Sequence, residues 1–361
     1  MIVSVQLGPR SYDIVVERGA LGSVGARLHA LRVGGRALLV TDPGIGRLYG
    51  KTVLESLAAA GFTTSVFEVP EGEAAKTPAV AARGWDACVE AGLDRSSTVL
   101  ALGGGAVGDL AGFVSATYMR GTNFVQLPTT VLAQVDASSG GKTALDHPKG
   151  KNMIGAFHQP RLVLVDTATA ETLPPREYRS GLAEVVKHGI VLDAAYFDDV
   201  EASAEALLAR DPSTVERVVG GSCRLKASVV ERDELESALR MVLNYGHTIG
   251  HAIEAATGYA ALTHGEAVSL GMVAEAALAV RLGIASAQTR ERQERLLARL
   301  GLPIRMAAVD PARVLEAMTR DKKARNGQVP IVLAPEIGRF TIAERVSPDD
   351  VRAALAEIVD Q

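Results

Sequence analysis

The stretch TVLALGGGAVGDLAGFVS, residues 98–115, decides the fold class of this chain. It opens on an apolar run typical of a buried strand, passes through a glycine turn and continues into a helical pattern. Gly103, Gly105 and Gly108 satisfy the spacing G-x-G-x-x-G, in which glycines let the backbone approach a phosphate and the helix start favours negative charge. The stretch therefore predicts a strand–turn–helix unit with a dinucleotide pyrophosphate site at the turn.

A tight turn that needs glycine for its geometry alone is the alternative interpretation. This is not the first strand-to-helix turn of the chain, and no acidic residue follows at the distance of about 20 positions at which a standard Rossmann unit holds a ribose. A second loop, PEGEAAKT (70–77), also follows a strand pattern. It offers Glu73 and Lys76 to ribose hydroxyls or phosphates.

Similar patterns flank this unit on both sides. Strands are predicted at 37–42, 63–70, 124–130 and 162–166, and helices near 49–60, 77–92 and 107–118. Such alternation indicates an α/β domain with a mostly parallel sheet covered by helices.

The pattern of apolar and polar residues changes after TLPPREY (172–178). Long amphipathic runs follow at about 180–192, 196–209, 213–233, 240–257, 265–282, 285–300 and 310–319. They predict a mainly helical domain, closed by a short strand pair and a last helix. We therefore expect a nucleotide-binding α/β domain over residues 1–178 and a mostly helical domain over 179–361.

The composition is that of an ordinary globular protein, with 47% hydrophobic and 22% charged residues. The net charge of −4 gives no basis for binding nucleic acid or an anionic membrane. No apolar run reaches the roughly 20 residues of a membrane span. Cys88 and Cys223 are far apart in the sequence, and the start, MIVSVQLGPRSYDIVV, lacks signal-peptide features, so a cytoplasmic protein is expected.

A long polar, glycine-rich segment, VDASSGGKTALDHPKGKNMIGAFHQP (135–160), lies between two strand signals. Loops of this length are usually functional or disordered, and the interleaved apolar residues argue against disorder. Lys142, Lys149 and Lys151 with Asn152 would suit a phosphate or a polyhydroxylated acid. The alternative is a solvated basic loop.

Three histidines fall within NYGHTIGHAIEAATGYAALTHGEA (244–267). His247, His251 and Glu254 have helical spacing and share one face, so they could bind a metal together. One of these histidines with His264 and a distant carboxylate is equally possible, and buried core histidines are the third interpretation. Thr248 occupies the place of the general-base Glu of HExxH, which argues against metalloprotease chemistry.

SGLAEVVKHG (180–189) supplies a candidate for the distant carboxylate. Glu184 lies in an apolar run, where an unpaired charge would be costly, and a metal would satisfy it. Lys187 lies on the same helical face.

These stretches together closely resemble the 3-dehydroquinate synthase family of sugar-phosphate cyclases. The matching segments occur in family order over nearly the whole chain: PEGE..K, GGGAVGD, YMRGTNFVQLPTT, VDASSGGKT, GKNMIGAF, TLPPRE, GLAEVVKHG, RMVLNYGHTIGHAIE, THGEAVSLGM and DKKARNG. The combination is specific, although no single segment is.

The resemblance implies site residues at the matching positions. A metal, zinc or cobalt, would be held by Glu184, His247 and His264. The residues expected to contact the substrate are Lys142, Lys151, Asn152, Lys187, Lys226, Arg240, Asn244 and His251, with Arg120 and Lys322 or Lys323 at the phosphate. The residues expected to bind NAD are Asp42, Glu71, Gly72, Glu73, Lys76, Gly104, Gly105, Ala106, Val107, Gly108, Asp109, Thr129, Thr130, Asp136, Lys142, Lys151, Thr169, Ala170, Glu171 and Thr172.

The resemblance also implies a reaction, the second step of the shikimate pathway. 3-Deoxy-D-arabino-heptulosonate 7-phosphate would become 3-dehydroquinate and phosphate through transient oxidation by NAD, phosphate elimination, re-reduction and an aldol cyclisation. A homodimer is implied as well, with Arg120 placed to serve the neighbouring subunit. The alternatives are a sister cyclase acting on sedoheptulose 7-phosphate, a metal-dependent polyol dehydrogenase, and a catalytically inactive NAD-binding module.

Overall fold

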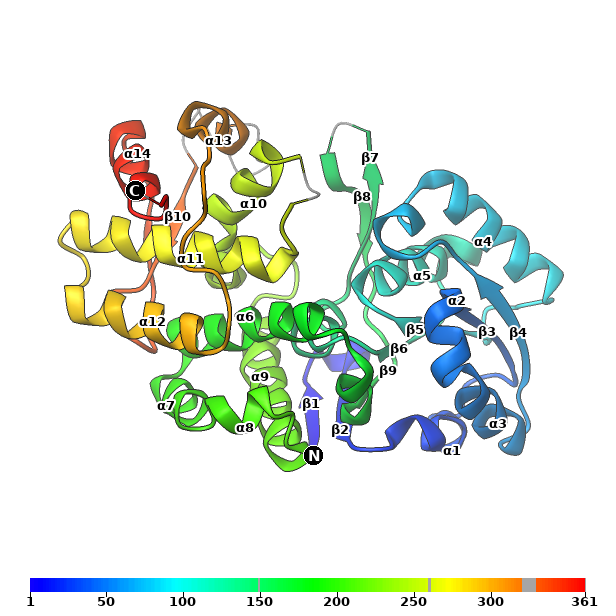
Figure 1. Cartoon of the computed structure of the whole chain (residues 1–361). Helices are drawn as coiled ribbons and strands as arrows, with labels where there is room; N and C mark the ends of the chain where they lie inside the picture. The colour runs from blue at the N-terminus through cyan, green and yellow to red at the C-terminus, as the bar shows by residue number, and fades with distance from the viewer. Residues whose placement is uncertain (149, 259–260, 320–328, 361) are drawn as a thin grey trace. The chain divides into compact units, whose positions relative to one another are not determined.

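The computed structural model describes residues 1–148, 150–258, 261–319 and 329–360, and the chain forms two compact units (Figure 1). The first unit comprises Met1–Leu173 and Val215–Leu235. The second comprises Pro174–Thr214 and Glu236–Gln361. The predicted boundary between residues 178 and 179 assigned the segment 215–235 to the helical domain, whereas in the structure this segment belongs to the first unit.

A seven-stranded sheet forms the centre of the first unit, in the order β1-β2-β9-β6-β5-β3-β4. β1 is antiparallel to β2, and the other neighbouring pairs are parallel, which confirms the predicted sheet. The strands are β1 (Ile2–Val5), β2 (Tyr12–Glu17), β3 (Arg36–Thr41), β4 (Thr63–Glu68), β5 (Thr98–Gly103), β6 (Asn123–Pro128) and β9 (Leu162–Asp166).

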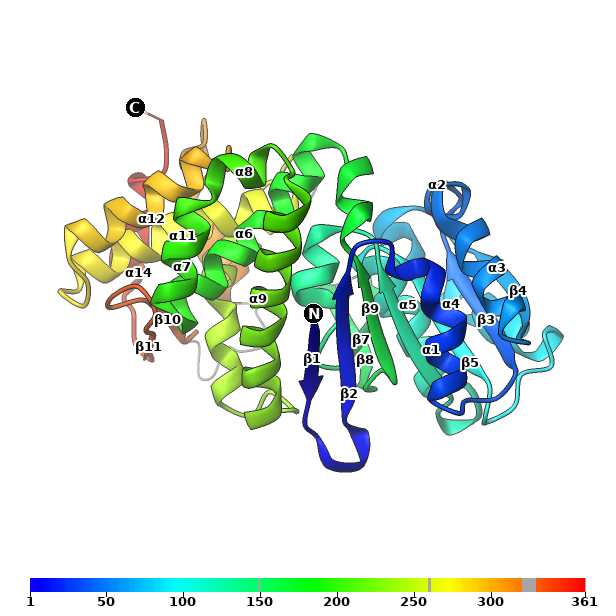
Figure 2. The ribbon, with the colours of Figure 1, turned by 90° about the horizontal axis from the view of Figure 1, so that it is seen from below.

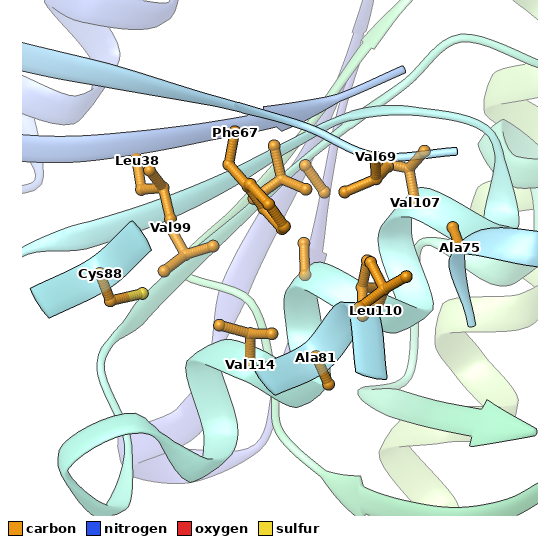
Figure 3. Close-up of a cluster of buried hydrophobic side chains, with 14 of the residues drawn as sticks. Leu38, Phe67, Val69, Ala75, Ala81, Cys88, Val99, Val107, Leu110 and Val114 are labelled. Atoms are coloured by element: carbon orange, nitrogen blue, oxygen red, sulfur yellow. The ribbon is translucent and has the colours of Figure 1, made fainter. Parts of the chain in front are cut away.

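Helices cover both faces of this sheet, so its central strands are apolar on both sides. Leu38 and Val99 enter one hydrophobic cluster with α4 and α5, drawn in Figure 3, while their neighbours Leu39 and Leu100 enter another with α1 and α3. This alternation follows from the two-residue period of a strand. The helices are α1 (Val24–Ala30), the short α2 (Pro43–Ile45), α3 (Lys51–Ala59), α4 (Pro78–Glu90) and α5 (Gly105–Thr117).

The polar segment 135–160 is a hairpin over most of its length. After a π-helical turn at Ala133–Ala137, β7 (Lys142–His147) pairs antiparallel with β8 (Gly150–Phe157) as a separate two-stranded sheet. The expectation of a long loop was wrong for these strands. Most of β8 is exposed, so it lacks the alternation of apolar and polar residues by which a half-buried strand is recognised.

Helix α9 (Pro212–Arg232) joins the first unit through most of its length. It lies beside β1 (Figure 2), and a Cβ atom added to Gly220 would come within 2.7 Å of the sulfur of Met1. Further contacts anchor α9 and the residues after it: the Cys223 thiol donates to the carbonyl of Gln134 at 3.3 Å, and Arg10 pairs with Glu234 at 2.7 Å.

The second unit is mainly helical, as predicted. Its helices are α6 (Pro175–Leu192), α7 (Ala194–Ala202), α8 (Ala204–Leu208), α10 (His247–Ala256), α11 (His264–Arg281), α12 (Ala287–Arg299), α13 (Pro311–Thr319) and α14 (Pro348–Ala356), with a small sheet of β10 (Ile331–Leu333) and β11 (Thr341–Ala343). The single helix expected near 240–257 is interrupted. A 3₁₀ segment, Leu239–Asn244, precedes Gly246, whose φ of +76° ends one run before α10 begins.

Within the described ranges, none of the helices combines the length and apolarity required to cross a membrane.

Candidate active site

Three predicted ligands converge in the second unit. Glu184 lies in the middle of α6 and is fully buried, while His247 and His264 are the first residues of α10 and α11. The Nε2 atoms of His247 and His264 lie 3.4 and 3.5 Å from the same oxygen, Oε1 of Glu184. Two imidazoles and one carboxylate suit a catalytic zinc ion, which takes about three protein ligands and keeps one position open.

A second set of possible ligands shares one of these residues. His251, Glu254 and His264 also offer atoms that all lie within 4.8 Å of one another, as do those of the first set. Glu254 Oε2 lies 4.0 Å from Nδ1 of His264, on the opposite ring nitrogen from the one facing Glu184. A carboxylate on the far nitrogen commonly orients a metal-binding histidine, so Glu254 is placed to orient His264 when the Nε2 atom of that ring binds the ion.

The protonation of His247 suits a ligand. Its Nδ1 donates to the carbonyl oxygen of Tyr245 at 3.0 Å, so Nε2 is left with its lone pair towards Glu184. Burial, followed by the nearby charge of Lys187, lowers the pKa of His247 to about 3. The imidazole is therefore neutral at physiological pH, as metal binding requires.

The local sequence explains why two helices start at this point. Thr263 caps α11 in a reciprocal capping box with Glu266, which makes His264 the first helical residue. Gly265 allows α11 to approach α6 closely, because a Cβ atom there would lie 1.9 Å from the carbonyl oxygen of Ser180. The Gly265 N–H also donates to the Ser180 hydroxyl at 2.9 Å.

Three further residues that the resemblance places at the substrate, Lys187, Arg240 and Asn244, belong to the second unit. The Lys187 ammonium contacts Oε2 of Glu184 from one helical turn away, and both side chains are buried. Arg240 is only 1% exposed. Asn244 is half-buried, and its amide nitrogen is fully buried with no hydrogen-bond partner in the part of the chain that the structure describes. Such a donor is suited to a ligand oxygen.

The glycine turn of the first unit lies at a reversal of strand order. The chain passes from β3 to β4 on one side and then to β5 on the other, and such a point leaves a crevice at the carboxyl ends of the strands. Gly104 caps α5 there, directly after β5. Asp42 follows β3 and Thr129 follows β6, and the buried Thr129 hydroxyl has no hydrogen-bond partner among the described residues. Asp42, Gly104 and Thr129, three predicted NAD contacts, thus directly follow three neighbouring strands of the sheet.

Lys76 joins the predicted cofactor residues into a network. Its Nζ lies 2.8 Å from Oδ2 of Asp109 on α5 and 3.8 Å from Glu73, and it also bonds the side-chain oxygen of Asn152 on β8. Burial alone would lower the pKa of Lys76, but the charges of Asp109 and Glu73 outweigh it and raise the pKa. Asp146 completes the network by accepting the Asn152 N–H at 2.8 Å.

Asp146 was missed as a site residue in the sequence. Asp146 stands where the family commonly has Asn, and spacing alone did not link it to its partners, which come from the Glu73–Lys76 segment and from Asn152 of β8. The only available signal was its place next to the basic residues of the same segment.

The remaining predicted residues of the first unit have varied surroundings. Lys226 Nζ lies 2.6 Å from Oδ1 of Asp136. Lys142 and Lys151 are exposed on the hairpin, and the pairing of Lys142 with Phe157 and of His147 with Gly150 places them towards opposite ends.

The turn Thr167–Thr172 contains several of the predicted NAD contacts. Two of their side chains already have hydrogen-bond or ion-pair partners within the protein. The Thr169 hydroxyl accepts from Gln134 at 2.9 Å, and Glu171 pairs with Arg18 at 2.7 Å. Their role at the cofactor stays a prediction. Lys322 and Lys323, like Lys149, lie outside the described residues.

Comparison with known proteins covers both units. A family model described as 3-dehydroquinate synthase N-terminal matches residues 66–180, and one described as 3-dehydroquinate synthase C-terminal matches residues 181–324. The chain is 52% identical to the 3-dehydroquinate synthase of Pelotomaculum thermopropionicum, over 94% of this chain and 92% of that one. It is 47% identical to that of Desulforamulus reducens, over 98% and 99% of the two chains.

Among solved structures, the chain resembles 2-epi-5-epi-valiolone synthase from Streptomyces hygroscopicus with NAD+ and Zn2+ bound, at a TM-score of 0.88 and 28% identity over 96% of both chains. It also shares the fold of 2-deoxy-scyllo-inosose synthase, at a TM-score of 0.90 and 24% identity over 99% of this chain and 100% of that one.

Proposed function

The chain belongs to the 3-dehydroquinate synthase family and carries that activity, and we propose that it does so with NAD held by the first unit and a zinc or cobalt ion held by Glu184, His247 and His264. The substrate is 3-deoxy-D-arabino-heptulosonate 7-phosphate, and the products are 3-dehydroquinate and inorganic phosphate. The observation that carries the proposal is the convergence of two imidazole nitrogens on one oxygen of a fully buried carboxylate.

The residues present fit both NAD and a divalent metal ion. Glu184 offers an oxygen, His247 and His264 offer nitrogens, and all three atoms lie within 4.8 Å of one another. The glycine turn leads directly into the start of α5, where a helix favours the negative charge of a pyrophosphate. When bound, NAD supplies a reversible hydride acceptor and the metal supplies a Lewis acid for a substrate oxygen.

The chain itself orients the ligands and holds the substrate's charges. Lys187 binds one oxygen of Glu184 and thereby leaves the other facing the two histidines. Arg240 and Asn244 offer buried donors, which are suited to the carboxylate and hydroxyl groups of a sugar acid. Positioning of this kind can remove a large part of a reaction barrier, since eliminating phosphate requires the leaving group and the adjacent C–H bond to be aligned.

We further propose a homodimer and a cytoplasmic setting. Met119 and Arg120 have φ values of +49° and +66°, an unusual backbone that presents the Arg120 side chain at the surface. This supports a role for Arg120 towards the substrate phosphate bound by the neighbouring subunit. The two buried cysteines form no disulfide, which is compatible with a reducing compartment.

The test is a turnover experiment with purified protein, a divalent metal, a trace of NAD and 3-deoxy-D-arabino-heptulosonate 7-phosphate. Release of phosphate far beyond the NAD supplied, without accumulation of NADH, is the expected result. Turnover of sedoheptulose 7-phosphate instead would assign the chain to a sister cyclase activity. Stoichiometric NADH formation from a simple polyol would overturn the proposal in favour of a dehydrogenase.

A further inference from the structure

Glu275 is a fully buried carboxylate on α11 that none of the roles above uses. Its Oε2 accepts the N–H of Gly246 at 2.6 Å, and its Oε1 accepts the N–H of Ile249 at 3.4 Å. Both donors belong to the beginning of α10, whose first residue is the metal-ligand candidate His247. Glu275 therefore reaches from one ligand-bearing helix to the start of the other.

Through these two hydrogen bonds, the Glu275 carboxylate acts as the N-cap of α10. The first N–H groups of a helix have no partner within it, and the side chain of the N-cap residue usually accepts one of them. Here the N-cap residue is Gly246, which has no side chain. Glu275 supplies the missing acceptor from α11, and its negative charge is favourable at the positive end of α10. The donors also explain how a carboxylate is tolerated in a fully buried position.

Packing holds the same backbone against α11. Gly246 has a φ of +76°, and a Cβ atom there would lie 2.5 Å from Cγ of Met272 and 2.8 Å from the carbonyl oxygen of Val268. A glycine is thus required by both conformation and space. The backbone therefore has little freedom on the side that faces α11.

The segment held in this way orients His247. The Tyr245 carbonyl accepts the Nδ1–H of His247 at 3.0 Å, and the Tyr245 hydroxyl donates to Gln293 at 2.6 Å. A change in the Gly246 peptide would move that carbonyl and with it the ring of His247. The chain of contacts runs from Glu275 through the backbone to the nitrogen that faces Glu184.

We infer that Glu275 is a positioning residue that fixes His247 for metal binding by capping α10 from α11. The inference rests on the proposed role of His247 as a metal ligand. Glu275 touches neither metal nor substrate in this role, and outer partners of metal ligands typically change metal affinity by about 10–100-fold.

The experiment titrates the metal-free full-length protein with Zn2+ and Co2+. Glu275→Ala should weaken Zn2+ binding by about 10–100-fold and alter the visible absorption spectrum of bound Co2+. Glu275→Gln keeps one acceptor oxygen for Gly246, so its loss of affinity should be smaller, and it serves as the folded variant if the alanine protein is unstable.

Ser269→Ala is the matched control. Ser269 is also fully buried on α11, but its hydroxyl donates to the carbonyl of Pro303 and not to α10. This variant should lose stability yet keep its Zn2+ affinity and Co2+ spectrum. Unchanged affinity and spectrum in both Glu275 variants would overturn the inference. If His247→Ala also kept full affinity, the proposed ligand set itself would fail, so the two failures are distinguishable.

Discussion

The Nε2 atom of His247 lies 3.4 Å from Oε1 of Glu184, although 63 positions separate the two residues in the sequence (247 − 184 = 63). The same oxygen lies 3.5 Å from Nε2 of His264. A carboxylate oxygen faced by two histidine ring nitrogens is in the surroundings that a divalent cation prefers, because the cation can accept a lone pair from each of the three atoms.

Removing His247 should therefore abolish tight metal binding, whereas removing His251 should not. His247→Ala deletes one of the three atoms around the proposed ion, while His251→Ala leaves Glu184, His247 and His264 in place. Metal content after dialysis, measured by mass spectrometry, should fall to background in the first variant and stay near one ion per chain in the second. The reverse result would assign the ion to His251, Glu254 and His264.

The Lys76–Asp109 pair should show strong coupling in a double-mutant cycle. Lys76 is almost completely buried, and burial already raises the pKa of Asp109 against the opposing charge of Lys76. Lys76→Met leaves the carboxylate without this partner and should cost about 3 kcal/mol in the free energy of unfolding. Lys76→Met combined with Asp109→Asn should cost clearly less than the sum of the two single changes, as measured by denaturant titration. Additive losses would show that the two charges do not interact.

Gly271→Ala should separate α10 from α11. A Cβ atom there would lie 1.9 Å from the carbonyl oxygen of Gly246 and 2.8 Å from the backbone nitrogen of Gly250, both of which are rigid. We expect a loss of about 3 kcal/mol in unfolding free energy, at the upper end for overpacking, together with weaker Zn2+ binding.

Gly50→Ala is the control for this change. Gly50 has helical φ and ψ, and nothing lies within 4 Å of an added Cβ atom. It should leave metal binding unchanged and stabilise the protein by about 0.4–1 kcal/mol, because alanine restricts the unfolded chain. If Gly271→Ala and Gly50→Ala changed the Zn2+ affinity equally, the predicted link between the close contact of α10 with α11 and metal binding would be contradicted.

Stability should fall in mild acid partly through His158. Burial lowers the pKa of this histidine, although its bond to the Thr122 carbonyl at 3.0 Å opposes the shift. Below the ordinary histidine pKa of about 6.5 the unfolded chain binds a proton that the folded protein does not, so stability is lost as the pH falls from there towards the lowered pKa. His158→Gln should flatten the decline in unfolding free energy between pH 7.5 and 5. A parallel decline in both proteins would remove His158 as its cause.

Local sequence patterns were sufficient for most elements of the fold. The strand predicted at 162–166 is β9, and the helix predicted near 77–92 is α4, because buried strands and amphipathic helices each carry their own period. The hairpin β7–β8 was not predicted as strands, because β8 is mostly exposed and therefore lacks the alternation of apolar and polar residues that marks a strand. Helix α9 was recognised as a helix, but its pattern could not say that it packs with the first unit.

The amino-acid sequence by itself determined the two kinds of architecture, the glycine turn after β5 and the residue types of the metal site. It left two possible sets of metal ligands and a set of buried core histidines open as interpretations, because spacing relates only residues that share one helix. The tertiary structure decided that the first residues of α10 and α11 meet Glu184 of α6, and it alone placed Glu275 under the start of α10. The physical reason is that such contacts depend on how closely helices approach one another, which here is set by Gly265 and Gly271 of α11 against the backbones of α6 and α10, elements that local spacing cannot bring together.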